Sequence, residues 1–145
     1  MKKSRRMQTL VKLARIEEEH AVLQRNEAQN AYSAHLGKLR ELESFYKEYK
    51  QRMDTLGGAG MDMGRLNEYR GFVRQIDQAL KIQRQLVAEA RGVLERHDES
   101  WKAARVHHKA LDNYQSRCRK EEDLESAKRE QKESDERAMR ARSLY

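Results

Sequence analysis

The chain of 145 residues has too few apolar side chains to fill a globular core, since 37% are hydrophobic and 38% charged. Globular domains are roughly 45–50% apolar and about 25% charged. A deep catalytic cleft is therefore not expected. A membrane span is not expected either, because it needs roughly 20 consecutive apolar residues. The apolar residues of this chain suffice to fill one narrow seam between two helices.

The positive charge is concentrated at the N-terminus. The chain has 31 Lys and Arg against 24 Asp and Glu, a net charge of +7. Residues 1–15 contain no acid and supply most of the excess, through Lys2, Lys3, Arg5, Arg6, Lys12 and Arg15. No apolar stretch of the kind found in secretory signals follows them. The single Cys118 excludes an intramolecular disulfide and suits a reducing compartment, so we expect a soluble, cytoplasmic protein.

The first long segment repeats every seven residues. One line is apolar except for a histidine and comprises Met7, Ala14, Ala21, Ala28, His35, Leu42, Tyr49 and Leu56. The second line is polar in its middle and comprises Val11, Glu18, Arg25, Tyr32, Leu39, Tyr46 and Met53. Leu10, Leu13 and Ile16 are expected to widen the apolar face. The pattern predicts a helix over about 4–56.

A glycine cluster interrupts the repeat. Four of the seven glycines fall between Gly57 and Gly64, and proline is absent. The cluster lacks the lysine and Ser/Thr of a phosphate-binding loop, and no strand precedes it. We therefore expect a turn over 57–64.

The second long segment carries a more regular repeat. Its first line is Leu66, Val73, Leu80, Val87, Leu94, Trp101 and His108. Its second line is Tyr69, Ile76, Gln83, Ala90, His97, Ala104, Leu111 and Cys118. These two lines predict a coiled-coil helix over about 65–118.

Folding the chain at the glycine cluster brings both pairs of lines into register. Residues whose numbers add to about 122 then face each other, and large side chains meet small ones, as with Trp101 and Ala21. The expected fold is all-α, a long antiparallel two-helix coiled-coil hairpin that forms one rod-like unit over 1–145. Each arm of about 50 residues would be roughly 75 Å long.

The last segment, 119–145, has no packing face. Residues 119–142 carry eight basic and eight acidic side chains, many of them three or four apart. Such spacing supports a solvated helix that continues the second arm and frays.

Metal chemistry and nucleic-acid binding have weak support. Glu17-x-x-His20 is one half of a di-iron motif whose second half is missing. His107 and His108 are adjacent, so they point about 100° apart on a helix. The basic block at 1–15 is short and its helix pairs within the chain, unlike zipper-type DNA readers. We expect no metal, cofactor, small-molecule substrate or nucleic acid. His35 and His97 are expected to help set the register of the seam.

Five short motifs follow one another along the chain: Leu10-x-x-Leu13-Ala14, Leu42-x-x-Phe45-Tyr46-x-x-Tyr49, Tyr69-x-x-Phe72-x-x-x-Ile76-x-x-Ala79-x-x-x-Gln83, Trp101 and Asp135-Glu136-x-Ala138-x-Arg140. In this order and spacing, they resemble the FliJ family of flagellar type III export proteins over nearly the whole chain.

The resemblance implies a stalk without catalytic residues that inserts into a hexameric export ATPase. It also implies contacts with the membrane export-gate protein FlhA and with export chaperones, at the cytoplasmic face of the membrane at the flagellar base. Its processes would be flagellum biogenesis, motility and chemotaxis. The protein alone would be mainly monomeric. Stalks of virulence secretion systems and self-associating structural coiled coils remain alternatives.

Two sets of partner-binding residues follow. Lys2, Lys3, Arg5 and Arg6 lie at the tip expected to enter the ATPase ring, where they would meet acidic loops. The family pattern points to Phe72, Ile76, Ala79 and Gln83 as the gate contact. The alternative for Ile76 and Gln83 is that they fill the seam, whereas Phe72 lies off both seam lines.

Overall fold

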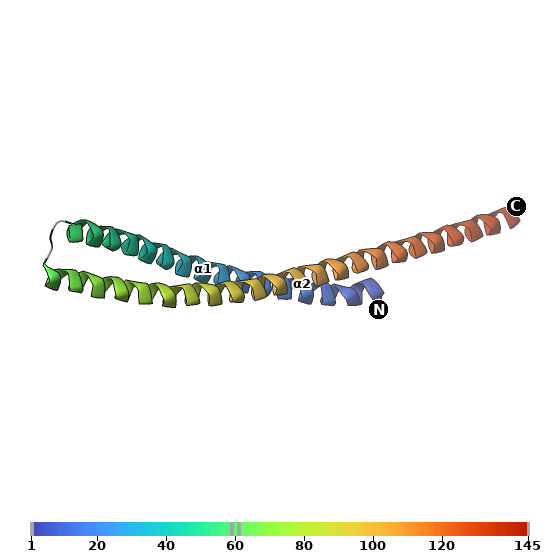
Figure 1. Cartoon of the computed structure of the whole chain (residues 1–145). Helices are drawn as coiled ribbons and strands as arrows, with labels where there is room; N and C mark the ends of the chain where they lie inside the picture. Colours follow the sequence, from blue (N-terminus) through green and yellow to red (C-terminus); the bar gives the residue numbers. More distant parts are fainter. Residues whose placement is uncertain (1, 59, 61, 145) are drawn as a thin grey trace. The chain divides into compact units, whose positions relative to one another are not determined.

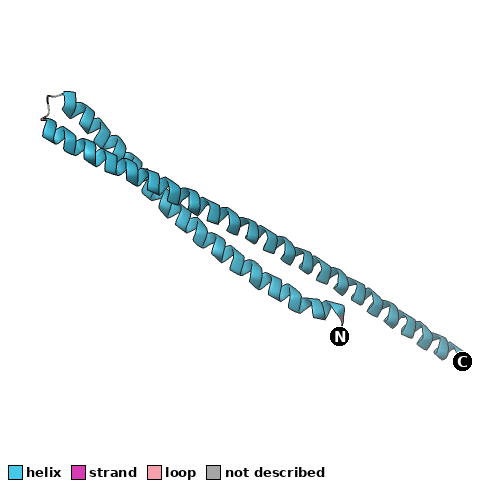
Figure 2. Ribbon diagram, turned by 60° about the horizontal axis from the view of Figure 1, so that its bottom comes forward, coloured by secondary structure: helices cyan, strands magenta, loops and turns pink. Residues whose placement is uncertain are grey.

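The computed structural model describes residues 2–58, 60 and 62–144, and over these residues it contains two helices and no strand. Helix α1 is Lys3–Gly58 and helix α2 is Met63–Ser143. A short connection joins them (Figure 1, Figure 2). The predicted two-helix hairpin is confirmed. The sequence predicts helices at about 4–56 and 65–118, the second continuing into the charged tail 119–145; in the structure α1 ends at Gly58 and α2 at Ser143.

The connection depends on one glycine. Gly60 has a φ of 79°, in the left-handed region where a Cβ is strained and glycine is not. Gly57 and Gly58 belong to α1 and Gly64 to α2, so the helices use part of the predicted turn. Ala59 and Met61 lie outside the described residues.

The chain divides into two compact units, and each contains a segment of both helices. Unit 1 is Met1–Ala21 with Trp101–Tyr145, and unit 2 is Val22–Ser100. In unit 1, Glu18 contacts His108 and Ser4 contacts Glu122. In unit 2, Arg25 contacts Asp98, and the rings of Tyr49 and Tyr69 lie near each other. Each pair's numbers add to within about one helical turn of 122, so the antiparallel register is confirmed within each unit.

The seam follows the predicted lines. Every residue on the four heptad lines is buried or half-buried. The most deeply buried apolar side chains are Ala14 and Leu80, each 2% exposed. Leu10, Leu13 and Ile16 depart from expectation, since they are 48%, 53% and 59% exposed. A two-helix seam covers only two heptad lines of each helix; Leu10 lies beside these lines, and Leu13 and Ile16 lie farther round toward the outer face.

The register assigns heptad letters to both helices. On α1, position a includes Val11 and d includes Ala14; on α2, position a includes Leu80 and d includes Gln83. In an antiparallel pair the g positions of both helices flank one edge of the seam and the e positions flank the other. In unit 1, for example, Lys3 and Tyr114 are both g residues and lie together.

The charged tail is helical as far as Ser143. All described residues from 127 to 144 are exposed. Pairs one turn apart run along the helix, such as Arg137 with Glu133, 3.8 Å apart. Such pairs support a helix that has no packing face of its own.

Candidate partner-binding surfaces

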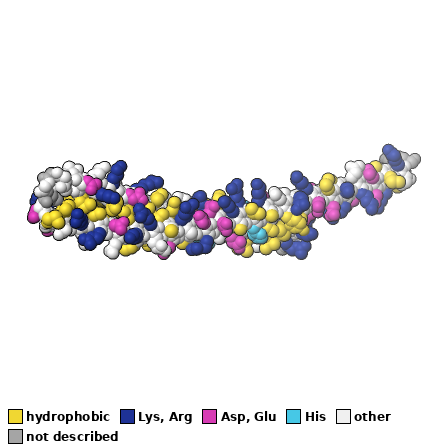
Figure 3. All heavy atoms as spheres, viewed as in Figure 1, with side chains coloured by type: hydrophobic (Ala, Val, Ile, Leu, Met, Phe, Trp, Pro, Cys, Tyr) yellow, Lys and Arg dark blue, Asp and Glu magenta, His cyan; other side chains and the backbone are white. Residues whose placement is uncertain are grey.

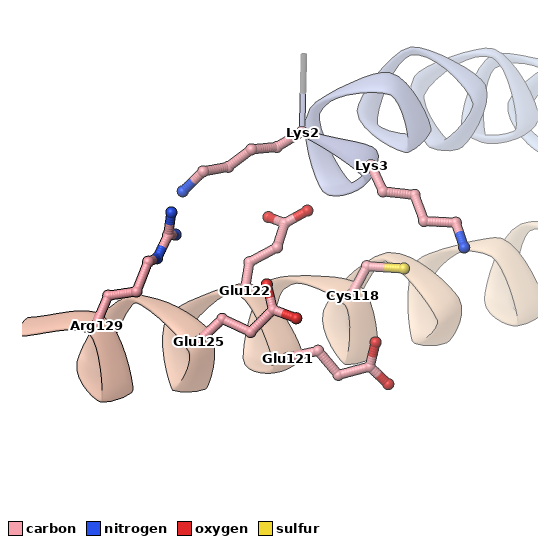
Figure 4. A pocket seen from close by; sticks show the side chains of 7 residues that line it. All are labelled: Lys2, Lys3, Cys118, Glu121, Glu122, Glu125 and Arg129. Atoms are coloured by element: carbon pink, nitrogen blue, oxygen red, sulfur yellow. The ribbon is translucent and has the colours of Figure 1, made fainter. Parts of the chain in front are cut away.

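The start of α1 is held by a carboxylate from α2. Glu122 accepts a hydrogen bond from the backbone N–H of Ser4 at 3.0 Å and another from the Ser4 hydroxyl at 2.5 Å. Figure 4 shows Glu122 pointing from α2 toward the start of α1. A helix N-terminus presents unsatisfied N–H groups and partial positive charge, so a carboxylate is favoured there. The hydrogen bonds from Ser4 lower the pKa of Glu122 below its ordinary value.

Two of the four predicted ring-binding residues lie beside acids and an aromatic ring of α2. Lys2 and Lys3 line one surface hollow together with Glu121, Glu122 and Glu125 (Figure 4). The ammonium of Lys3 lies 5.7 Å from the centre of the Tyr114 ring. A hydrogen bond to the Tyr114 side chain is the main cause that raises the pKa of Lys3. These two lysines therefore contact α2 at the place in unit 1 where the start of α1 packs against it.

Arg5 and Arg6 are exposed on the next residues of α1. The exposed Leu10, Leu13 and Ile16 follow them on the same helix. The sequence analysis expected these three residues to widen the apolar face and so missed them as an exposed surface. The structure thus gives this part of α1 an exposed apolar stripe that begins next to basic residues.

Phe72 belongs to an aromatic cluster in unit 2. Its ring centre lies 4.8 Å from that of Tyr49, and the ring of Tyr69 lies 6.4 Å from Tyr49. The Arg52 guanidinium lies 5.6 Å from the centre of the Tyr49 ring. Phe72 is nevertheless 45% exposed, and Phe45 is 51% exposed. Large exposed aromatic side chains are typical of surfaces that bind other proteins.

Two of the predicted gate residues lie in the seam. Ile76 is 8% exposed and Gln83 is 7% exposed. The Gln83 amide donates a hydrogen bond of 2.8 Å to the backbone carbonyl of His35. Ala79 is half-buried. The structure therefore does not bring the four predicted gate residues to one exposed surface, and Phe72 is the one that a partner can reach most easily.

Polar side chains pair across the seam in both units. The carboxylate of Glu18 lies 2.5 Å from Nδ1 of His108 in unit 1. In unit 2, the Arg25 guanidinium lies 3.1 Å from the carboxylate of Asp98. On the outer surface, acidic and basic side chains alternate (Figure 3). The polar positions on the second line of α1 are thus accounted for by partners on α2.

Among residues 2–58, 60 and 62–144, no three His, Cys, Asp or Glu side chains are grouped so that they could hold a metal ion. Neither helix, over the part described, contains a stretch long and apolar enough to cross a membrane. The thiol of Cys118 is buried and unpaired with another cysteine.

Comparison with protein families matches residues 2–143 to the family described as Flagellar FliJ protein. The chain belongs to the FliJ family. The match spans both helices and both units, and it agrees with the resemblance carried by the sequence motifs. Comparisons with curated proteins and with solved structures gave no match. FliJ membership associates the chain with flagellum biogenesis and with protein export at the flagellar base.

Proposed function

We propose that this FliJ-family chain is a non-enzymatic stalk that inserts into the hexameric flagellar export ATPase and stimulates it. The observation that carries the proposal is the surface of α1 in unit 1. There Arg5 and Arg6 are exposed and are followed by Leu10, Leu13 and Ile16, each about half exposed. A basic segment followed by an exposed apolar stripe would bind well in the central opening of the ATPase ring if that opening is lined by acidic loops and apolar side chains.

The experiment is an ATPase titration with the purified export ATPase. The wild-type chain is expected to raise the rate of ATP hydrolysis, and Leu13→Glu is expected to raise it less, because a charge enters the apolar stripe. Ile82→Glu is the matched control, since Ile82 is 64% exposed and lies in unit 2. Equal stimulation by both variants would remove the apolar stripe from the proposal. No stimulation by the wild type would remove the proposal itself.

We further propose that the chain links the ATPase to the export gate FlhA and to export chaperones. The exposed ring of Phe72, with Ala79 two turns along α2, is the surface on which the gate contact depends; Ile76 and Gln83 support it from the seam. Phe72→Ala is expected to weaken binding to the cytoplasmic part of FlhA at least tenfold. Val106→Ala serves as control, because Val106 is 69% exposed in unit 1. Normal binding by Phe72→Ala would exclude this surface.

Given these partners, the chain is proposed to lie at the cytoplasmic face of the inner membrane, beneath the flagellar base. Motility, and with it chemotaxis, depends on export of flagellar subunits. The protein alone is proposed to be mainly monomeric, because its seam is closed within one chain. A self-associating coiled coil is the second candidate, favoured by the exposed stripe of Leu10, Leu13 and Ile16. Sedimentation separates the two, since a self-associating chain grows in mass with concentration.

A further inference from the structure

The g edge of the seam in unit 2 carries an apolar strip outside the aromatic cluster. On α2, Ile82 is 64% exposed, Leu86 37% and Val93 36%. Their spacings of four and seven residues place them within about 40° of one another around the helix. They are not seam residues, because the seam positions along this stretch of α2 are Leu80, Gln83 and Val87. Three large apolar side chains thus share one outward stripe.

On the facing part of α1 the g positions are Ala31, Lys38 and Phe45, so a small residue lies opposite Val93 and an exposed aromatic ring opposite Ala79. The register places Ala31 opposite Val93 along the g edge, and Ala34 lies one turn further along α1. Small residues let another backbone approach closely. We define the central groove as the set of residues along this edge, namely Ala31, Ala34, Ala79, Ile82, Leu86 and Val93. From Ala79 to Val93 it is about 21 Å long, which corresponds to four turns of helix.

The two edges of the seam differ in charge. Beside the central groove lie three acidic residues, Glu27 and Glu41 on α1 and Glu89 on α2, and two basic ones, Lys38 on α1 and Arg96 on α2. Gln85 donates a hydrogen bond of 3.3 Å to Glu89 on its own helix, which leaves the negative charge of Glu89 in place. The opposite, e edge carries mostly basic residues, with Arg70, Arg84 and Arg91 on α2. The apolar edge of unit 2 is therefore the more acidic of the two.

We propose that the central groove binds an amphipathic helix of a partner protein, whose apolar face is bordered by Lys and Arg. The apolar strip, with the small Ala31 across from Val93, suits a third helix that lies along the seam. The glutamates beside it favour a basic border and disfavour an acidic one. The inference deepens the proposed gate contact, on which it rests for the partner's identity, since Ala79 belongs to both surfaces.

The probe is a labelled 18-residue helical peptide with Leu at its a and d positions and Lys at its e and g positions. Its binding to the full-length chain is followed by fluorescence anisotropy at two salt concentrations. Wild type is expected to bind it, and more weakly at the higher salt. Ile82→Glu is expected to weaken binding at least tenfold. Leu23→Glu, the matched control, is expected to change it less than twofold, since Leu23 is 61% exposed elsewhere on unit 2.

Charge reversal gives a second, independent readout. The double variant Glu41→Lys and Glu89→Lys is expected to lose affinity for the Lys-bordered peptide and to gain affinity for the same peptide with Glu at e and g. Absence of binding by wild type would overturn the proposal. The proposal would also be overturned if the wild-type chain bound the Lys-bordered and the Glu-bordered peptide equally well. The same holds if Ile82→Glu and Leu23→Glu weakened peptide binding by the same factor. A wild-type dimer that Ile82→Glu dissociates would assign the groove to a second copy and overturn it too.

The same variants separate this inference from the proposed function. Binding to the cytoplasmic part of FlhA is measured in parallel with wild type and Ile82→Glu. If the peptide behaves as expected while FlhA binds neither protein, the gate proposal fails and the groove assignment holds. If FlhA binds both proteins equally and the peptide binds neither, the gate proposal holds and the groove assignment fails.

Discussion

The carboxylate of Glu122 on α2 binds both the backbone N–H and the hydroxyl of Ser4 on α1. A residue near the C-terminal end of the chain thus performs the capping that usually comes from the residue just before a helix. The side chain of Gln115 adds a hydrogen bond of 3.3 Å to the Ser4 carbonyl. These contacts hold the basic N-terminal turn of α1 against α2 within unit 1.

Replacing Glu122 by Gln is expected to destabilise the first turn of α1 in a pH-dependent way. The pKa of Glu122 is lowered by its hydrogen bonds from Ser4. A carboxyl group with a lowered pKa stabilises the folded state above its unfolded pKa and loses this contribution as the pH falls through its folded pKa. Hydrogen exchange of the α1 amides should therefore differ between wild type and Glu122→Gln at pH 7. The difference should vanish in acid, well below the ordinary glutamate pKa of 4.5.

The matching change on the other helix is Ser4→Ala. It removes the hydroxyl donor, so the pKa of Glu122 is expected to rise toward its ordinary value. Carboxyl carbon chemical shifts, followed by NMR as a function of pH, measure this directly. An unchanged Glu122 titration in Ser4→Ala would show that the two side chains do not interact in solution.

Leu80→Ala is expected to cost about 2–5 kcal/mol in free energy of unfolding, as for other buried leucines. Leu80 is 2% exposed and its heptad line is the most regular in the chain. Chemical denaturation followed by circular dichroism gives the change. Leu23→Ala is the matched control, because Leu23 is 61% exposed and surface substitutions change stability by roughly 0.5 kcal/mol or less. Similar costs for the two variants would mean that the seam does not lie where the heptad lines place it.

The seam was predictable because heptad spacing alone decides which residues face the partner helix. Even Glu18 and Arg25, charged residues on a seam line, lie where the spacing puts them. The partner of Arg25 could not be predicted, because Asp98 lies beside the lines and reaches Arg25 only through its side-chain conformation. The exposure of Leu13 was also missed, since an apolar pattern does not tell how many helices share it.

The same limit applied to the partner-binding residues. A spacing of four, three and four put Phe72, Ile76, Ala79 and Gln83 on one stripe, but the stripe straddles the border of the seam. Only the packing shows that Gln83 turns inward to the carbonyl of His35, while Phe72 stays 45% exposed. The capping of Ser4 by Glu122 left no signal in the sequence, because it depends on which part of α2 lies against the start of α1.

The double variant His35→Leu and His97→Leu is expected to raise the melting temperature and to loosen the register. Both histidines are half-buried on seam lines. Apolar layers there would stabilise pairing in general, whereas polar layers disfavour slipped pairings. Thermal melts and sedimentation measure the two effects. If the register and the monomeric state stay unchanged and the melting temperature does not rise, these histidines do not set the register.

The four basic residues at the N-terminus are expected to divide into two pairs with different effects. Arg5→Glu with Arg6→Glu should lower stimulation of the export ATPase, most strongly at low salt, because these side chains are exposed on α1. Lys2→Glu with Lys3→Glu should mainly loosen the first turn of α1, because it places new acids beside Glu121 and Glu122.

ATPase titrations over a range of salt concentrations measure the first effect, and hydrogen exchange at the start of α1 measures the second. The lysine variant is the control for the arginine variant. Both variants change the net charge by the same amount, at positions only three residues apart in the sequence. The arginine variant should keep wild-type protection of the first turn, because its side chains lie outside the hollow lined by Lys2 and Lys3. If instead the lysine variant loses stimulation while its first turn stays protected, Lys2 and Lys3 contact the ATPase themselves. In that case their contacts with α2 must open when the ring binds.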